Sequence, residues 1–146
     1  MILGIGTDVV NVNRFSRWTC FSPRQLQKIF SQQELFDCYN QAGPVQKQAD
    51  YIAQKFASRF AAKEAFYKAL NGMLLALDIM PKQHISFLFV CNYVQVLVDS
   101  FGRPILDINW NPLIDKIGYA IPSVRVHLSL THEKTVALAF VIISQK

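Results

Sequence analysis

Apolar, β-branched runs and one strictly alternating segment predict strands at both ends of the chain. Residues 1–10 are apolar and β-branched, and Gly4 and Gly6 within them indicate close approach of a neighbouring backbone. Residues 124–131 alternate strictly. Their apolar face holds Val124, Val126, Leu128 and Leu130, and their polar face, a candidate site face, holds Arg125, His127, Ser129 and Thr131. Residues 135–143 are apolar on both faces, so we expect cover on both sides, with another subunit as one candidate.

Helical spacing replaces alternation between residues 46 and 70, which predicts the main helix of the chain. Its core-facing stripe consists of Ile52, Phe56, Phe60 and Tyr67. Glu64 lies at the edge of this stripe, and Lys68 follows it one turn later. The pair Asn71-Gly72 predicts the end of the helix, because both residues tolerate the left-handed conformation of a C-terminal cap.

Shorter elements are predicted by capping and turn residues. Ser22 to Gln25 and Ser31 to Glu34 are capping boxes, each expected to start a helix, and the second helix should stop near Gly43-Pro44. The later segments are strands at 84–91, 93–99 and 105–108, with a turn at 100–104. Asn111-Pro112 can start a short helix that ends by Gly118.

Composition narrows the class of protein. With 146 residues, 51% of them hydrophobic and 17% charged, the chain is predicted to fold as a single globular domain spanning residues 1–146. The net charge of +5 indicates an acidic partner, such as a nucleic acid, a phosphorylated ligand or an acidic protein. No acid occurs between Val9 and Gln33, and the cations there form either a solvated face or a docking surface: Arg14, Arg17, Arg24 and Lys28.

Cysteine usage and hydropathy bear on location. The cysteines are Cys20, Cys38 and Cys91, an odd number without a Cys-x-x-Cys motif, which favours reduced thiols in the cytoplasm. The N-terminus lacks a basic segment and carries Asp8 early, unlike a signal peptide. No apolar run approaches the roughly 18 residues of a membrane span. We therefore expect a cytoplasmic protein that does not enter the membrane.

Asp8 and Glu64 are the leading candidates for chemistry, because each is a carboxylate in an apolar context. A divalent cation would relieve their repulsion, and Mg²⁺ commonly takes one or two protein carboxylates beside substrate phosphate. The plainer alternative is that Asp8 caps a turn and Glu64 pairs with Lys68. Gly4-Ile5-Gly6 lacks the third glycine of a dinucleotide loop, so backbone packing beside Asp8 is its better explanation.

Further polar residues have weaker signals. Arg59, Lys63 and Lys68 could neutralise phosphates, but a solvated helix face would look the same. His132 follows a strand with Ser129 three residues before it, and could act as a base or bind phosphate. No third member fits a Ser-His-Asp triad.

Two motifs resemble those of the holo-acyl-carrier-protein synthase family, the small 4′-phosphopantetheinyl transferases. Residues 4–14, GIGTDVVNVNR, look like the family's N-terminal Gly-x-Asp motif with a following arginine. Residues 59–69, RFAAKEAFYKA, are close to its Lys-Glu-Ala-x-x-Lys-Ala motif. Residues 102–104 and 128–132 also resemble segments of this family, but more weakly. The resemblance runs through almost the whole chain, although Asn71-Gly72-Met73 replaces the Gly-Thr-Gly turn that often follows the second motif.

The resemblance implies an α+β fold with a long helix packed on an antiparallel sheet. It also implies transfer of the phosphopantetheine arm of coenzyme A (CoA) to a serine of acyl carrier protein, with release of adenosine 3′,5′-bisphosphate. Asp8 and Glu64 would hold Mg²⁺ on the CoA diphosphate, and Lys68 would contact that diphosphate. The implied CoA site also includes Arg59, which would meet the 3′-phosphate, together with Ser129 and His132.

Carrier-protein docking and assembly follow from the same resemblance. Arg14 would contact the acidic carrier protein, and the attraction would extend over Arg17, Arg24 and Lys28. The family is usually a homotrimer with sites between subunits, which suits the apolar last strand. Two alternatives remain: a CoA-binding relative without transfer activity, and a basic nucleic-acid-binding module. The second is disfavoured because Phe56, Phe60, Phe66 and Tyr67 have the spacing of a helix core and do not interleave with cations on a sheet.

Overall fold

The computed structural model describes residues 1–40 and 48–146 and has the predicted α+β architecture, with antiparallel strands and one long helix. The strands are β1 (Ile2–Asn11), β2 (Val94–Val98), β3 (Pro104–Ile108), β4 (Val124–His132) and β5 (Val136–Gln145). The helices are the 3₁₀ helix η1 (Val12–Cys20), α1 (Pro23–Leu26), α2 (Gln32–Asn40), α3 (Gln48–Ala76), α4 (Phe87–Cys91) and α5 (Trp110–Ile117).

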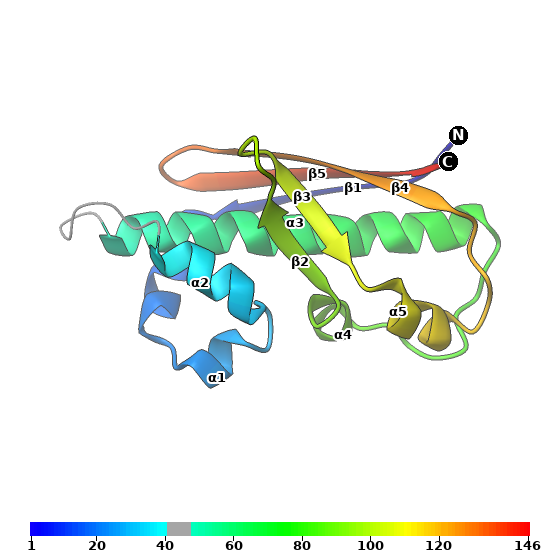
Figure 1. Cartoon of the computed structure of the whole chain (residues 1–146), viewed down its shortest axis with the longest axis horizontal. Coiled ribbons are helices and arrows are strands. Elements are labelled where there is room, and N and C mark those ends of the chain that lie inside the picture. Colours follow the sequence, from blue (N-terminus) through cyan, green and yellow to red (C-terminus); the bar gives the residue numbers. More distant parts are fainter. Residues whose placement is uncertain (41–47) are drawn as a thin grey trace.

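Helix α3 lies between two layers (Figure 1). On one side is an antiparallel sheet in the order β1-β5-β4, and on the other are the short helices. The hairpin of β2 and β3 lies beside α3, with β2 next to α2 and β3 next to β4. The two termini meet at one end of the sheet, where the Gln145 amide donates to the Met1 carbonyl at 2.9 Å.

Helix α3 is buried on more than the predicted stripe. Ile52, Phe56 and Phe60 are buried as expected, and Tyr67 is half-buried with its hydroxyl donating to the Ile85 carbonyl at 3.0 Å. A second buried row consists of alanines four residues apart: Ala53, Ala57, Ala61, Ala65 and Ala69. Their small side chains let the backbones of α3 and β1 come close together, and this contact positions the candidate site.

An aromatic cluster fixes η1 and α1 on the opposite side of α3. The rings of Phe30 and Phe56 stack with centroids 5.0 Å apart, and Phe15 lies 5.3 Å from Phe60. Trp18 joins them, 4.7 Å from Phe15. Burying large rings stabilises the fold by roughly 1.5–3 kcal/mol each, so the segment after β1 is held firmly although η1 and α1 are short.

The predicted helix starts at Ser22 and Ser31 and the predicted helix end at Gly118 are confirmed. The Ser22 amide donates to Gln25 Oε1 at 3.0 Å, and the Ser31 amide donates to Glu34 Oε2 at 2.8 Å, at the starts of α1 and α2. Gly118 follows α5 in the left-handed conformation, with φ of 75°. The polar residues of β4 share one face of the strand, as the alternation predicted, and that face is exposed.

Two predicted boundaries are wrong. The main helix does not end at Asn71-Gly72 but continues to Ala76, because Met73 and Leu74 are buried and Gly72 packs against β1 at Gly4 and Ile5. Residues 84–91 do not form a strand. They contain helix α4, whose first turn is capped by Ser86 Oγ, which accepts a hydrogen bond from the Phe89 amide at 3.2 Å.

The outer face of the sheet is only partly covered. On β5, the residues that face α3 are fully buried, whereas Leu138, Phe140 and Ile142 on its other face are half-buried. The predicted cover on both sides is therefore not supplied by the described residues of one chain. The predicted stop at Gly43-Pro44 and the predicted start at Gln46 lie outside the described residues. In the part of the chain that is described, every helix is too short or too polar to span a membrane.

Candidate active site

Strand β1 reaches the helix through a row of alternating residues. Gly4, Gly6 and Asp8 all face α3, because residues two apart point to the same side of a strand. A Cβ atom at Gly4 would lie 2.1 Å from the Ala69 carbonyl oxygen, and one at Gly6 would lie 1.9 Å from that of Ala65. Only glycine permits this approach, so the glycines are explained by backbone packing, which brings the next residue of the row, Asp8, onto α3.

Asp8, Glu64 and Lys68 meet where β1 runs alongside α3. Lys68 Nζ donates to Asp8 Oδ1 at 2.8 Å and to the Thr7 carbonyl at 3.0 Å, and it lies 3.9 Å from Glu64 Oε1. Asp8 is buried, with 9% of its side chain exposed, whereas Glu64 is one-third exposed. Both carboxylates thus surround one cation, and the nearer partner of Lys68 is the strand residue and not its helical neighbour.

Two buried polar atoms lack hydrogen-bond partners among the described residues: Asp8 Oδ2 and Arg59 Nε. A buried polar group without a partner costs free energy, so such atoms mark places where something else is expected to bind. Asp8 Oδ2 is a hard oxygen acceptor, which suits a divalent cation. Arg59 Nε is a cationic donor, which suits an anion.

The donor set around Asp8 fits Mg²⁺. No group of three or more His, Cys, Asp or Glu residues with metal-site geometry occurs among the described residues. A site with two carboxylates, Asp8 and Glu64, open on the Glu64 side leaves the remaining positions for water and phosphate oxygens. That is the usual arrangement for Mg²⁺, which rarely has an all-protein shell.

Arg59 lines a separate cavity of about 270 Å³ with His132. Its walls also include Tyr51, Lys55 and Leu130, from α3 and β4. Arg59 is held by Asp37, 3.9 Å away, and is 6% exposed. The cavity therefore combines a buried guanidinium, a lysine and a histidine, which is a suitable set for a phosphate group.

The predicted site residues fall into separate groups in one chain. Glu64 lies five positions after Arg59, so at about 100° per residue the two side chains point to different sides of α3. Arg59 and His132 share the cavity, and Lys68 lies with the two carboxylates. Ser129 belongs to neither group, because its side chain is on the exposed face of β4, opposite Leu130.

Lys63 does not face solvent or phosphate as the helix-face interpretation allowed. Its Nζ is fully buried, lies 2.7 Å from Glu34 Oε2, and donates to the carbonyls of Ile29 and Cys91. The other carboxylate oxygen of Glu34 accepts from the Val96 amide at 2.9 Å. This pair joins α2, α3 and β2. Sequence reasoning saw Glu34 only as a capping residue, and nothing in the local pattern indicates its distant partner.

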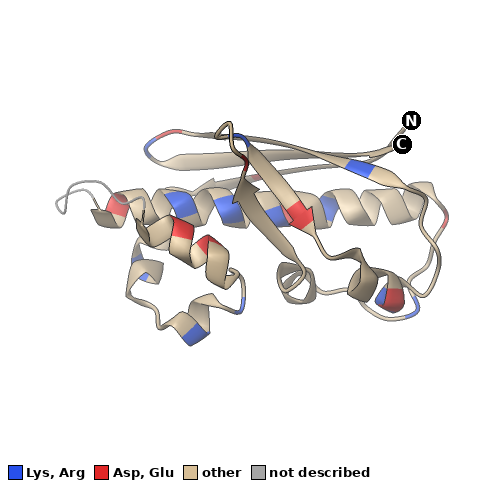
Figure 2. Cartoon of the chain, in the orientation of Figure 1, with Lys and Arg blue, Asp and Glu red and all other residues tan. Residues whose placement is uncertain are grey.

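The cations of the N-terminal third form an exposed basic surface. Arg14, Arg17, Arg24 and Lys28 are all exposed on η1, on α1 and just after α1. Figure 2 shows Lys and Arg on this part of the chain, and the next acidic residues along the chain lie in α2. The Arg14 guanidinium lies 5.1 Å from the centre of the Phe60 ring, which supports its stem while leaving the charge accessible.

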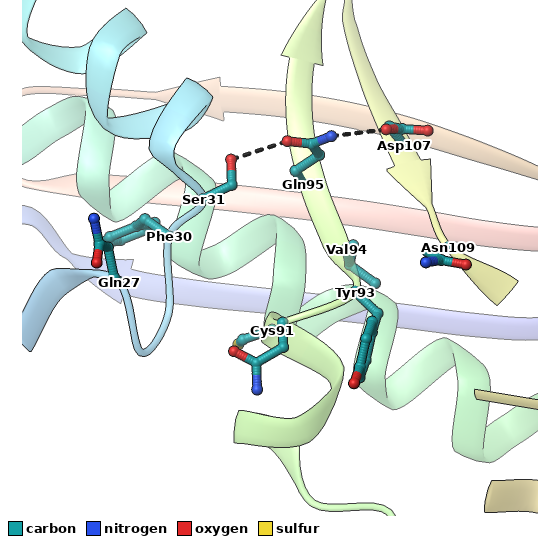
Figure 3. A pocket seen from close by; sticks show the side chains of 10 residues that line it. Gln27, Phe30, Ser31, Cys91, Tyr93, Val94, Gln95, Asp107 and Asn109 are labelled. Carbon is teal, nitrogen blue, oxygen red and sulfur yellow. Dashed lines mark hydrogen bonds between the residues drawn. The ribbon is translucent and has the colours of Figure 1, made fainter. Parts of the chain in front are cut away.

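Sequence reasoning also missed a polar groove of about 290 Å³ between α1, α4 and the hairpin (Figure 3). Ser31 Oγ lies 2.9 Å from Gln95 Oε1, and Gln95 Nε2 donates to Asp107 Oδ2 at 2.8 Å. Gln27 and Asn109 add further amides to its wall. None of the predicted site residues lines this groove. Its hydrogen bonds tie the start of α2 to the hairpin, which is a structural role.

Comparison with known proteins shows which family this chain resembles in sequence and structure. Residues 4–109 match the family model described as the 4′-phosphopantetheinyl transferase superfamily. The holo-[acyl-carrier-protein] synthase of Treponema denticola is 35% identical and covers 98% of both chains. The structure of a holo-(acyl-carrier-protein) synthase from Bacillus anthracis in complex with CoA (3′,5′-ADP) aligns with a TM-score of 0.69, at 25% identity, over 100% of this chain and 99% of that one. A Chronobacterium ammoniagenes ACPS-CoA complex aligns with a TM-score of 0.74, at 25% identity, over 98% and 97%.

Proposed function

The chain belongs to the 4′-phosphopantetheinyl transferase superfamily, and from this premise we propose that it transfers the 4′-phosphopantetheine arm of CoA to a serine of apo-acyl carrier protein. Adenosine 3′,5′-bisphosphate would be the second product. The similarity of this chain to a holo-[acyl-carrier-protein] synthase extends over 98% of both chains, so this transfer is the best-supported activity. CoA in the aligned synthase structures supports CoA as co-substrate.

The observation that carries the proposal is that Asp8, whose Oδ2 has no partner among the described residues, and the one-third exposed Glu64 both lie at the Lys68 ammonium. These two residues would hold Mg²⁺, which when bound supplies positive charge to the CoA diphosphate. Lys68 would add a further cation to that diphosphate, since its Nζ already lies at the carboxylates and its side chain is 46% exposed. Asp8, Glu64 and Lys68 are thus the proposed catalytic set. Phosphoryl transfer depends mainly on such positioning and charge neutralisation.

The cavity at Arg59 is the proposed site for the 3′-phosphate. The unpartnered Nε of Arg59 supports an anion there, and His132 and Lys55 lie on the same cavity wall. A monoanion or dianion with several acceptor oxygens can accept from a guanidinium and an imidazole together. Ser129 would join this CoA site from a neighbouring subunit.

We propose that the protein assembles as a homotrimer with its sites between subunits. The proposed CoA residues point to different sides of α3 and β4 in one chain, so a second copy would be needed to unite them. The open face of the sheet is largely apolar on β1 and β5, where Ile5 and Val9 are 53% and 58% exposed beside the half-buried Phe140, and polar on β4. A second copy would cover this face.

The basic surface of Arg14, Arg17, Arg24 and Lys28 is the proposed docking site for acyl carrier protein. All four cations are exposed, and among the described residues no acidic side chain lies between them in the sequence. An acidic carrier would gain association rate and orientation from this field. With these roles we also propose that the protein is a single-domain enzyme of fatty acid biosynthesis that acts in the cytoplasm.

A mass-spectrometric assay tests the proposal. The protein, CoA, Mg²⁺ and an apo-acyl carrier protein are incubated, and we expect the carrier to gain the mass of one phosphopantetheine group. A carrier whose acceptor serine is changed to alanine should gain nothing. CoA binding without any mass gain would favour the CoA-binding relative that lacks transfer. Salt-sensitive binding to DNA or RNA, with no metal-dependent binding of CoA, would favour the nucleic-acid module.

A further inference from the structure

The ammonium of Lys68 lies between two carboxylates that would also bind a metal ion. Its ammonium is bonded to Asp8 Oδ1 at 2.8 Å and to the Thr7 carbonyl at 3.0 Å, and Glu64 Oε1 lies 3.9 Å away. Three oxygen atoms from β1 and α3 therefore surround one nitrogen. Without this cation the two carboxylates would repel each other across the contact of β1 with α3.

Lys68 is much more exposed than its partner Asp8, and this difference favours replacement of its ammonium by another cation. Asp8 is 9% exposed and fixed on β1, but Lys68 is 46% exposed at the end of a flexible stem. Asp8 Oδ2 still has no partner among the described residues, so the ammonium satisfies only one of the two carboxylate oxygens. A divalent ion carries twice the charge and prefers oxygen ligands, so it is the stronger partner for both carboxylates.

We infer that Lys68 is an exchangeable counter-cation: it neutralises Asp8 and Glu64 before the metal binds, and it leaves Asp8 when the metal arrives. The released ammonium is then free to face the phosphates of CoA. This inference rests on the proposed metal role of Asp8 and Glu64. It gives Lys68 two successive partners, a carboxylate and then a phosphate, and it explains how a pair of acids stays in place without metal.

The alternative is a permanent bridge, in which Lys68 keeps its bond to Asp8 in every state. The two possibilities predict opposite effects of removing the charge. If Lys68 must leave, its bond to Asp8 competes with the metal, and a neutral residue will strengthen metal binding. If Lys68 stays and holds the carboxylates in position, the same change misplaces both ligands, and this loss offsets the relief of charge repulsion, so metal binding will weaken or stay unchanged.

Titration calorimetry with Mg²⁺ alone, in the absence of CoA, separates these cases. We expect Lys68→Met to bind Mg²⁺ about threefold or more tightly than the unmodified protein. The same variant should melt at a lower temperature in EDTA and gain more from added Mg²⁺. Lys146→Met, an exposed change at the C-terminus, is the matched control and should change neither value. Equal or weaker binding in Lys68→Met, or no binding in either protein, overturns the inference.

A second measurement uses the unmodified protein. With ¹⁵N-labelled lysine, the Nζ signal of Lys68, assigned by its loss in Lys68→Met, should shift when Mg²⁺ is added. An unmoved signal at saturating Mg²⁺ overturns the exchange. The failure of this inference is distinct from failure of the proposed function. If the carrier is modified but the Lys68 signal does not shift, the transferase proposal holds and the exchange inference fails. If the Lys68 signal shifts but the carrier is not modified, the exchange inference holds and the transferase proposal fails.

Discussion

Lys63 Nζ lies 2.7 Å from Glu34 Oε2, and both side chains are fully buried between α2, α3 and β2. The pair is complete, because Nζ also donates to two carbonyls and Glu34 also accepts from two backbone amides. Such networks hold their surroundings in one arrangement. Since Lys63 adjoins Glu64 in α3, the buried pair fixes the helix turn that presents the proposed metal ligand.

Removing one member of this pair should be costly. Lys63→Met leaves Glu34 as a buried charge without its partner, and we expect a loss of about 3–5 kcal/mol in the free energy of unfolding. Urea denaturation measures it. The double variant Lys63→Met with Glu34→Gln should recover at least about 1 kcal/mol, because the unpaired charge is gone. Equal stability of the single and double variants would show that the ion pair is not the cause.

The proposed metal ligand should matter for activity and little for folding. Glu64→Gln removes a ligand charge, and we expect carrier modification to fall by at least about 100-fold. Glu64 is one-third exposed, and its 3.9 Å contact with Lys68 is weak. The melting temperature of the Glu64→Gln variant should therefore differ from that of the unmodified protein by only a few degrees. Asp115→Asn, an exposed acid on α5, is the control. Full turnover in Glu64→Gln would refute the metal role.

Two glycines that contact the same interface should respond in opposite directions. Gly6→Ala places a methyl group 1.9 Å from the Ala65 carbonyl oxygen, so β1 must move away from α3. We expect a loss of at least about 2 kcal/mol in the free energy of unfolding, with weaker Mg²⁺ binding because Asp8 moves too. Gly72→Ala meets nothing closer than 3.7 Å, inside a helix. It should stabilise the protein by about 0.5–1 kcal/mol. Denaturation of both variants tests the pair.

Reversing one charge on the basic surface should weaken the binding of acyl carrier protein and leave the binding of CoA unchanged. With Arg14→Glu, we expect KM for acyl carrier protein to rise about tenfold, while the affinity for CoA stays the same. Steady-state kinetics and CoA titration measure the two quantities. Lys146→Glu makes the same change of net charge away from η1 and should alter neither. A parallel loss of CoA affinity in Arg14→Glu would argue against a docking role.

Two buried thiols make stability depend on alkaline pH. Burial raises the pKa of Cys38 from 9.0 to about 11, against a smaller lowering by Arg59, and burial raises that of Cys91 to about 12. Above pH 9 the unfolded chain therefore releases protons that the folded chain retains, so stability is full below pH 9 and falls as pH rises toward 11. Urea denaturation from pH 8 to 11 should show a shallower fall for Cys38→Ala. An identical slope would contradict this origin.

The sequence by itself determined the local elements and the leading chemistry. Capping boxes at Ser22 and Ser31 and the glycine at Gly118 predicted helix ends, because caps act within a few residues of the chain. Alternation predicted β4, and apolar runs rich in β-branched residues predicted β1 and β5. The carboxylates Asp8 and Glu64 were distinctive in an apolar context, and their meeting on one face of α3 was implied by a resemblance of motifs.

Only the tertiary structure decided features that depend on distant contacts. Helix α3 passes the glycine at Gly72 because Met73 and Leu74 are buried against other elements. Lys63 is internal because Glu34 and two carbonyls converge on it from elsewhere in the chain. The Arg59 cavity exists because Leu130 and His132 of β4 come to lie beside α3, far from Arg59 in the sequence. Burial and partners arise from the whole packed chain, so no local pattern contains them.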